Sequence, residues 1–374
     1  MADNSISMFP ETDPELAEIW REKGVPKFFL PRVDKMPQTR ALHAQGNVRF
    51  MKSAFVKQTL GDQVLWTEED RSVVVRDGHS VAIRIYRPKS HPGPRPVMVL
   101  AHSGGLCMGG LDTEEFICQL LSMRLGIVVV SVAYRLAPEW LYPTCVYDVY
   151  DVIKWLSVNA QTIGADLSKG FLTGGVSGGG NTTCMAAIMA RDDKLQPPLT
   201  GHVFICTGMP HDYTDQKGHK LALFPEQLLK GSWERYKNGP VATREMNILY
   251  GRKLCSLLFK AENRAHTRDT EISQFDARDP YVTPLTQTDY SGLGPVFYQV
   301  AEMDIWKDSA LFYCEKIKEA GGQVKVEVYP GVPHLWWSMY PQLSINKKWI
   351  QNLVNGVEWL LSLQRGGAAL PSRL

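Results

Sequence analysis

The feature of this sequence that most constrains its fold is a regular alternation of strand-length apolar runs with segments of helical periodicity. Residues 96–102 (PVMVLAH) and 126–134 (GIVVVSVAY) are almost continuously apolar, which is typical of strands buried on both faces. Further strand-like runs cover residues 171–174, 202–206, 296–301 and 324–329. Segments of helical periodicity cover residues 114–124, 145–159, 178–191, 308–320 and 343–363. This alternation predicts an α/β fold with a mostly parallel central sheet and helices on both faces.

An antiparallel hairpin is expected at the start of the sheet. Residues 73–87 (VVVRDGHSVAIRIYR) hold two β-rich runs around the dipeptide Asp77-Gly78, which is a strong hairpin signal. The sheet should therefore be mixed rather than purely parallel.

Two stretches, residues 1–70 and 208–274, do not fit the alternation. Both contain many apolar and aromatic side chains, which need another surface to bury them. We expect them to form one helical cap over the carboxyl edge of the sheet, where open α/β sheets bind ligands. A small separate subdomain is the alternative. The predicted core then comprises residues 71–207 and 275–365, and residues 366–374 form a flexible tail.

Composition excludes several classes of function. The formal net charge is only +2, and no dense block of Lys or Arg appears, so a nucleic-acid partner is not expected. The apolar runs are strand-sized and too short to cross a bilayer, and no amphipathic or basic membrane element stands out, so no stable membrane association is expected. Neither the composition nor any motif specifies the oligomeric state.

Cysteine usage and the chain ends indicate an intracellular protein. The seven cysteines are odd in number and dispersed without metal-ligand spacing, which favours reduced thiols. Residues 1–20 lack the basic and apolar regions of a secretory signal. The final tripeptide Ser372-Arg373-Leu374 resembles the Ser-Lys-Leu peroxisomal address, so a cytoplasmic or a peroxisomal location is expected.

The strongest single catalytic motif surrounds Ser177. Residues 175–179 (GVSGG) follow a strand-like run and precede a helical one, and they match the Gly-x-Ser-x-Gly pattern. The flanking glycines permit the tight turn that exposes a serine at a helix N-terminus, where developing negative charge is stabilised. A structural or phosphate-binding turn is the alternative for such a pentapeptide by itself.

A second glycine-rich loop, residues 102–105 (HSGG), follows the apolar strand that begins at residue 96. Glycines at this place can aim backbone N–H groups at an oxyanion, because no side chain blocks the approach. We interpret His102 as a structural residue that braces this loop.

A serine nucleophile needs a histidine base and an acid that orients the base. His334 follows the last apolar strand in the loop of residues 331–334, where this fold places its base. The preceding strand ends just before Glu302, Met303 and Asp304, which makes Asp304 the expected acid. Glu302 and Asp308 are the alternatives, and helix capping is the alternative role for Asp304.

The order of these motifs resembles that of the hormone-sensitive-lipase family of α/β-hydrolase carboxylesterases, over about residues 70–365. The segments that carry the resemblance are HSGG (102–105), YRLAPE (134–139), GVSGG (175–179), DPYVTPL (279–285), SGLGPV (291–296), AEMDIWKD (301–308) and YPGVPH (329–334). The resemblance implies a triad of Ser177, Asp304 and His334 and an oxyanion hole of Gly104, Gly105 and Gly178. It also implies a cap built from the two stretches that flank the core.

Two departures from the family pattern concern the catalytic loops. Ser103 stands in place of the first glycine of the usual His-Gly-Gly-Gly loop, and the elbow reads Val176-Ser177-Gly178 instead of Asp-Ser-Ala. Every catalytic group is still present, but the substrates of typical members do not transfer directly.

The expected activity is hydrolysis of a hydrophobic small-molecule ester, with neither a metal nor an organic cofactor. Leu106, Cys107 and Trp336 flank the catalytic loops and are candidate substrate contacts, although each has packing as its alternative. An acyltransferase or a lactonising or cyclising enzyme of a biosynthetic pathway would use the same triad. A small-molecule receptor on this fold and a lipase acting at an interface also stay open.

Overall fold

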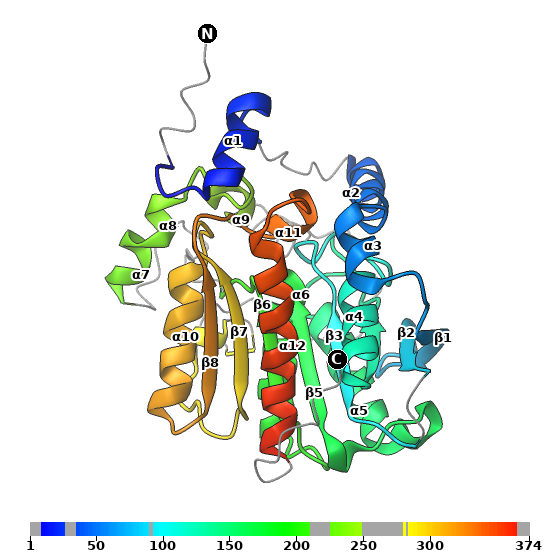
Figure 1. The fold of residues 1–374 in the computed structure, drawn as a ribbon. Coiled ribbons are helices and arrows are strands. Elements are labelled where there is room, and N and C mark those ends of the chain that lie inside the picture. The colour runs from blue at the N-terminus through cyan, green and yellow to red at the C-terminus, as the bar shows by residue number, and fades with distance from the viewer. Residues whose placement is uncertain are drawn as a thin grey trace.

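The predicted strands and helices form one mixed sheet with helices on both faces (Figure 1). The computed structural model describes residues 9–26, 35–89, 93–209, 225–248, 280–281 and 283–364. The strands are β1 (Trp66–Val74), β2 (Ser80–Pro88), β3 (Val97–Ala101), β4 (Val128–Val132), β5 (Phe171–Val176), β6 (Gly201–Ile205), β7 (Val296–Ala301) and β8 (Val324–Tyr329). The helices are α1 (Pro14–Lys23), α2 (Met36–Met51), α3 (Ala54–Leu60), α4 (Glu115–Leu125), α5 (Thr144–Asn159), α6 (Gly178–Asp192), α7 (Glu226–Lys230), α8 (Ser232–Arg235), α9 (Arg244–Ile248), α10 (Lys307–Glu319), α11 (Trp336–Met339) and α12 (Ile345–Leu363).

The sheet has eight strands in the order β1-β2-β4-β3-β5-β6-β7-β8. β1 and β2 form the expected hairpin, β2 pairs antiparallel with β4, and the strands from β4 to β8 are parallel to their neighbours. The predicted fold class is therefore confirmed. One boundary differs: β1 begins at Trp66, which pairs with Pro88, so the sheet starts before residue 71.

The central strands are buried on both faces, as their apolar runs predict. Within β4, Val129 belongs to the apolar cluster that contains α4 and α12 side chains, whereas Val130 belongs to the cluster that contains α5 and α6 side chains. The two residues lie on opposite faces because successive strand side chains alternate. α10 packs against β7 and β8.

The N-terminal helices lie at the carboxyl edge of the sheet, near α11 (Figure 1). α1 begins at an Asp13 N-cap, whose carboxylate accepts hydrogen bonds from two backbone amides of the first turn. The backbone N–H of Asp13 donates to the Gly331 carbonyl oxygen at 2.9 Å. The buried Trp20 Nε1 donates to the Tyr340 hydroxyl, also at 2.9 Å. These contacts attach the segment to the loops that follow β8.

The described part of the insertion, residues 225–248, contacts both the core and the N-terminal segment. The Ser232 hydroxyl donates to the Ile305 carbonyl at 3.0 Å, and the Ser232 amide donates to the Asp308 carboxylate at 2.7 Å. The Tyr236 hydroxyl donates to Glu11 at 2.7 Å. Much of the predicted cap insertion (residues 210–224 and 249–279) and the tail with Ser372-Arg373-Leu374 lie outside the described residues.

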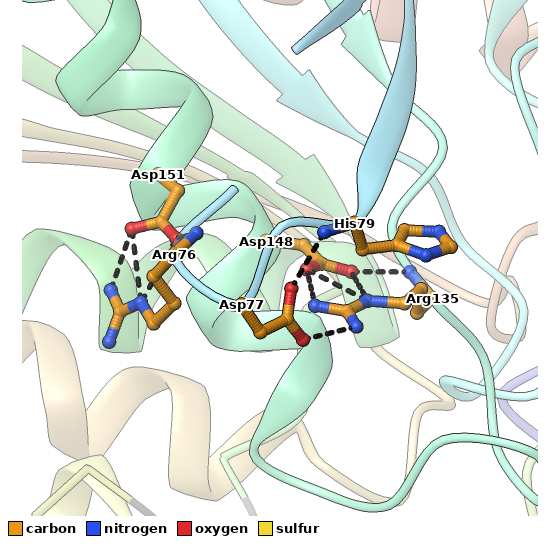
Figure 2. A network of polar contacts seen from close by, with 6 residues as sticks. All are labelled: Arg76, Asp77, His79, Arg135, Asp148 and Asp151. Carbon is orange, nitrogen blue, oxygen red and sulfur yellow. Dashed lines mark hydrogen bonds and ion pairs between the residues drawn. The ribbon is translucent and has the colours of Figure 1, made fainter. Parts of the chain in front are cut away.

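A charged network attaches the hairpin turn to α5 and to the loop after β4 (Figure 2). The guanidinium of Arg135, whose side chain is 5% exposed, is paired with the fully buried Asp148 of α5 and with Asp77 of the turn, each at 2.6 Å. The neighbouring Arg76 is paired with Asp151 at 2.7 Å. Asp148 also accepts the backbone N–H of Arg135 at 2.8 Å, so one carboxylate fixes both the side chain and the backbone of this residue.

Candidate active site

Ser177 lies at a sharp turn between β5 and α6. Its φ of 52° and ψ of −120° place a non-glycine residue in a strained region of backbone space. The turn requires glycine on either side: a Cβ on Gly175 would lie 2.4 Å from the Gly179 carbonyl carbon, and a Cβ on Gly179 would lie 2.2 Å from the Ala101 oxygen. The Ser177 amide donates to the Ile205 carbonyl at 2.9 Å, which helps hold the strained residue in place. The GVSGG motif therefore forms the predicted strand–turn–helix.

The structure brings Ser177, His334 and Asp304 together, although they are far apart in the sequence. Ser177 Oγ is 2.8 Å from His334 Nε2, and His334 Nδ1 is 2.6 Å from Asp304 Oδ2. All three side chains are buried. The other oxygen of Asp304, Oδ1, accepts the backbone N–H of Trp306 at 3.1 Å, and the Trp306 ring lies edge-on to the His334 ring with 5.2 Å between centroids. Both partners of the imidazole are thus held in position.

The two alternative acids are engaged elsewhere. Glu302 Oε2 accepts the Gly331 N–H at 2.9 Å, which makes it a brace for the loop that leads to His334. Asp308 lies at the start of α10 and accepts a hydrogen bond from the Ser232 backbone N–H. Of the three candidate acids, the structure thus places Asp304 on the imidazole.

Four other histidines follow Ser177 in the sequence, and the structure describes one of them. His202 is buried in β6, where Nδ1 lies 2.7 Å from the Thr173 hydroxyl, and burial lowers its pKa to about 4. His211, His219 and His266 fall outside the described residues.

His102 contacts the residues around the 102–105 loop. Its Nδ1 lies 2.7 Å from the Ser103 carbonyl oxygen, and its ring stacks on Tyr134 with 4.2 Å between centroids. The Tyr134 hydroxyl donates to the His102 carbonyl at 2.7 Å. Burial lowers the pKa of His102 to about 4, so the ring is neutral at physiological pH. These contacts agree with the structural role that the sequence suggested.

The three glycines predicted for the oxyanion hole belong to two loops. Gly104 and Gly105 lie in the 102–105 loop, and Gly178 directly follows Ser177. Gly104 has φ of 120°, and a Cβ there would be 2.2 Å from the Met108 oxygen, so only glycine fits. A Cβ on Gly178 would be 3.2 Å from the Gly105 amide nitrogen and the Leu106 amide nitrogen. The backbone amides of Gly105 and Leu106 and the residue after Ser177 are therefore neighbours.

A carboxyl group that sequence reasoning missed also contacts this loop. Glu114, which precedes α4, accepts the Ser103 backbone N–H at 3.0 Å. Its burial raises the pKa of the carboxyl group to about 7, despite the opposing effect of the hydrogen bond from Ser103. The sequence shows only a Glu at a helix start, a position that is usually exposed, so it contains no signal of this burial.

Cys206 is a further residue that the sequence did not indicate. It follows β6 with φ of 46°, and its sulfur, an Asp304 oxygen and a His334 nitrogen lie within 4.8 Å of one another. These are metal-ligand types, but Asp304 and His334 are already hydrogen bonded to each other. Burial also raises the pKa of the Cys206 thiol, which disfavours the thiolate that a metal needs. The arrangement therefore fits an acid–base pair with a neutral thiol beside it better than a metal site.

The three predicted substrate contacts differ in exposure. Trp336 is fully buried and packs against Tyr329, Trp337 and Trp349. Cys107 is also fully buried, in a small apolar cluster with Met36, Met108 and Ala137. Leu106 is partly exposed. The contacts of Trp336 and Cys107 are thus packing contacts, and Leu106 is the candidate that solvent reaches.

None of the helices in the described parts of the chain has both the length and the apolarity that crossing a bilayer requires.

Comparisons with known proteins show the family to which the chain belongs. Residues 98–338 match the family described as having the alpha/beta hydrolase fold. An AB hydrolase superfamily protein of Schizosaccharomyces pombe is 31% identical over 363 residues, which are 95% of each chain. The versiconal hemiacetal acetate esterase of Dothistroma septosporum is 29% identical over 299 residues, which are 80% of this chain and 83% of that one.

Among solved structures, vibralactone cyclase superposes with a TM-score of 0.80 at 26% identity, over 94% of this chain and 96% of that one. The family match spans 241 of the 374 residues, and the relatives are aligned over most of their own length. The chain belongs to the hormone-sensitive-lipase-like family of α/β-hydrolases and is a carboxylesterase-like hydrolase.

Proposed function

We propose that this chain hydrolyses an apolar carboxylic ester by two-step acyl transfer, with Ser177 as nucleophile, His334 as base and Asp304 as the orienting acid. The observation that carries the proposal is the pair of hydrogen bonds, 2.8 Å from Ser177 Oγ to His334 Nε2 and 2.6 Å from His334 Nδ1 to Asp304 Oδ2. This is the geometry that proton transfer from a serine hydroxyl requires.

In the first step, Ser177 Oγ attacks the ester carbonyl carbon while His334 Nε2 takes the hydroxyl proton. The amides of Gly104, Gly105 and Gly178 stabilise the tetrahedral oxyanion. His334 then protonates the leaving alcohol, and the acyl group remains on Ser177. Asp304 stays ionised and stabilises the imidazolium.

In the second step, His334 removes a proton from water, which attacks the acyl carbon. The bond between that carbon and Ser177 Oγ then breaks, His334 returns the proton to Oγ, and the acid is released. Each oxyanion donor is expected to contribute about 2.7–4 kcal/mol of transition-state stabilisation. The strained backbone of Ser177 supports this mechanism, because it presents the hydroxyl in one orientation before substrate arrives.

The substrate pocket is proposed to lie between the 102–108 loop and a cap made from the N-terminal segment and the insertion. The two stretches contact each other: Phe9 stacks on Tyr236 with 6.3 Å between centroids, and Arg235 is paired with Glu11 at 2.8 Å. This shared contact favours one cap over a small separate subdomain. Leu106 is the proposed apolar contact for the acyl or alcohol group.

The test is hydrolysis of p-nitrophenyl esters of increasing chain length by the wild type and by Ser177→Ala. We expect turnover in the wild type only, with a chain-length optimum that measures the pocket. A folded wild type without turnover would contradict simple ester hydrolysis.

A second candidate function is lactone formation, in which a hydroxyl of the substrate itself attacks the acyl group. The likeness to vibralactone cyclase favours it. Reaction of a hydroxy-ester substrate in H₂¹⁸O separates the two functions: hydrolysis places ¹⁸O in the acid product, whereas cyclisation gives an unlabelled lactone. A small-molecule receptor is the least supported alternative, because the serine, histidine and acid are all present and hydrogen bonded.

A further inference from the structure

An arginine of the N-terminal segment contacts both loops beside the proposed oxyanion hole. Arg40 lies on α2, and its Nε donates to the Cys107 carbonyl at 2.7 Å, while Nη2 donates to the Ala137 carbonyl at 2.8 Å. The same guanidinium forms two bonds to the Glu139 carboxylate, at 2.8 Å and 2.6 Å. A planar guanidinium has a fixed fork of donors, so it can hold several acceptors in one relative position.

The two carbonyls belong to segments that shape the 104–108 turn. The amides of Cys107 and Met108 both donate to the Gly104 carbonyl, at 3.2 Å and 3.0 Å, and so close the turn. The Ala137 amide donates to the Leu106 carbonyl at 2.9 Å. Arg40 therefore completes a closed set of hydrogen bonds that joins the turn to the segment after β4.

Other residues on the same face of α2 point to the same loop. Met36 packs with Cys107, Met108 and Ala137 in one buried cluster. Burial lowers the pKa of His43, which lies one turn further along the helix. Residues 36, 40 and 43 recur at helical spacing and share one face of α2, and the contacts of Met36 and Arg40 place that face over the loop.

We propose that Arg40 is a positioning residue, through which docking of the N-terminal segment fixes the backbone of the oxyanion loop. This inference rests on the proposed function. Arg40 does not touch the reacting atoms. It sets the place of the Gly104 and Gly105 amides, and it makes full activity depend on a docked N-terminal segment.

The test compares Arg40→Gln, Arg40→Lys and Glu139→Gln with the wild type. Arg71→Gln is the matched control: Arg71 is 31% exposed against 28% for Arg40, and it also joins a glutamate and a backbone carbonyl, but on β1. Two readouts are used: kcat and KM on a p-nitrophenyl ester, and the rate constant for labelling by an alkyl fluorophosphonate. In the labelling step, a bond forms between Ser177 Oγ and phosphorus, fluoride leaves, His334 takes the hydroxyl proton, and the phosphoryl oxygen occupies the oxyanion hole.

We expect Arg40→Gln to lower kcat and the labelling rate constant together, by about ten- to hundredfold, with little change in KM. Arg40→Lys should recover part of the loss, because an ammonium can still donate to a carbonyl. Glu139→Gln should lose less than Arg40→Gln, since it removes only a partly exposed ion pair. Arg71→Gln should behave like the wild type.

Wild-type kcat and labelling in Arg40→Gln would overturn the inference, as would a change in KM alone or an equal loss in Arg71→Gln. Failure of the proposed function is a different result: a wild type without ester turnover, or labelling that persists in Ser177→Ala. The labelling rate still tests Arg40 when Ser177 is reactive but the physiological reaction is not hydrolysis.

Discussion

The buried charge network at the hairpin turn supports a quantitative prediction for Asp148→Ala. The substitution removes a fully buried carboxylate that accepts the backbone amide, Nε and Nη2 of Arg135. Asp77 would remain as the carboxylate partner, but its side chain is 48% exposed. Because the guanidinium stays in a largely dry site, breaking the pair should lower the free energy of unfolding by about 3–5 kcal/mol.

The matched variant is Asp77→Ala, which removes an exposed partner of the same guanidinium and should cost no more than about 1 kcal/mol. A double variant, Arg135→Met with Asp148→Leu, should recover part of the loss, because it leaves no unpaired buried charge. Urea unfolding followed by tryptophan fluorescence and by circular dichroism measures these differences, with coincident transitions as the check on two-state behaviour. Equal losses for Asp148→Ala and Asp77→Ala would refute the reasoning.

Three further predictions concern the loops and the cap. Gly104→Ala should lower kcat/KM by at least about a hundredfold in ester turnover, because its Cβ would lie 2.2 Å from the Met108 oxygen; normal turnover would contradict this. Glu114 has a pKa raised from its ordinary value of 4.5 to about 7, so its ionisation opposes folding as the pH rises through this range. The free energy of unfolding of Glu114→Gln should therefore increase by up to about 3 kcal/mol relative to that of the wild type between pH 5 and pH 8, as measured by urea unfolding. A difference that does not depend on pH would refute this prediction. Trp20→Phe removes the 2.9 Å hydrogen bond to Tyr340 and should cost about 1 kcal/mol by the same method, whereas an unchanged midpoint would show that the bond contributes nothing.

The sequence was sufficient for the parts of the fold that depend on local pattern. The bounds of β7 and β8 match the apolar runs, and the helices that cover the sheet begin and end within a few residues of their periodic segments. β1 was predicted too short, because an edge strand with polar residues such as Glu68 and Asp70 has no apolar run to mark it.

The proximity of Ser177, Asp304 and His334 was predictable, because each of the motifs that contain them has a fixed place in the fold. The contacts of Arg40 and Glu114 could not be predicted, because each joins segments far apart in the chain and neither residue type suggests burial or a loop contact. Trp336 is a different case: its position next to a catalytic loop suggested a substrate contact, and its ring is fully buried among other aromatic side chains.

The most direct test of the proposed mechanism is intact-mass analysis of the protein during turnover of a slowly hydrolysed p-nitrophenyl ester, with Ser177→Ala in parallel. The mechanism predicts a wild-type mass increase equal to the mass of the acyl group minus one hydrogen atom, located on the peptide that contains Ser177. It also predicts no adduct in Ser177→Ala and a loss in kcat on the order of 10⁶. Ester turnover that persists in Ser177→Ala, or an acyl group on another residue, would contradict Ser177 as the nucleophile.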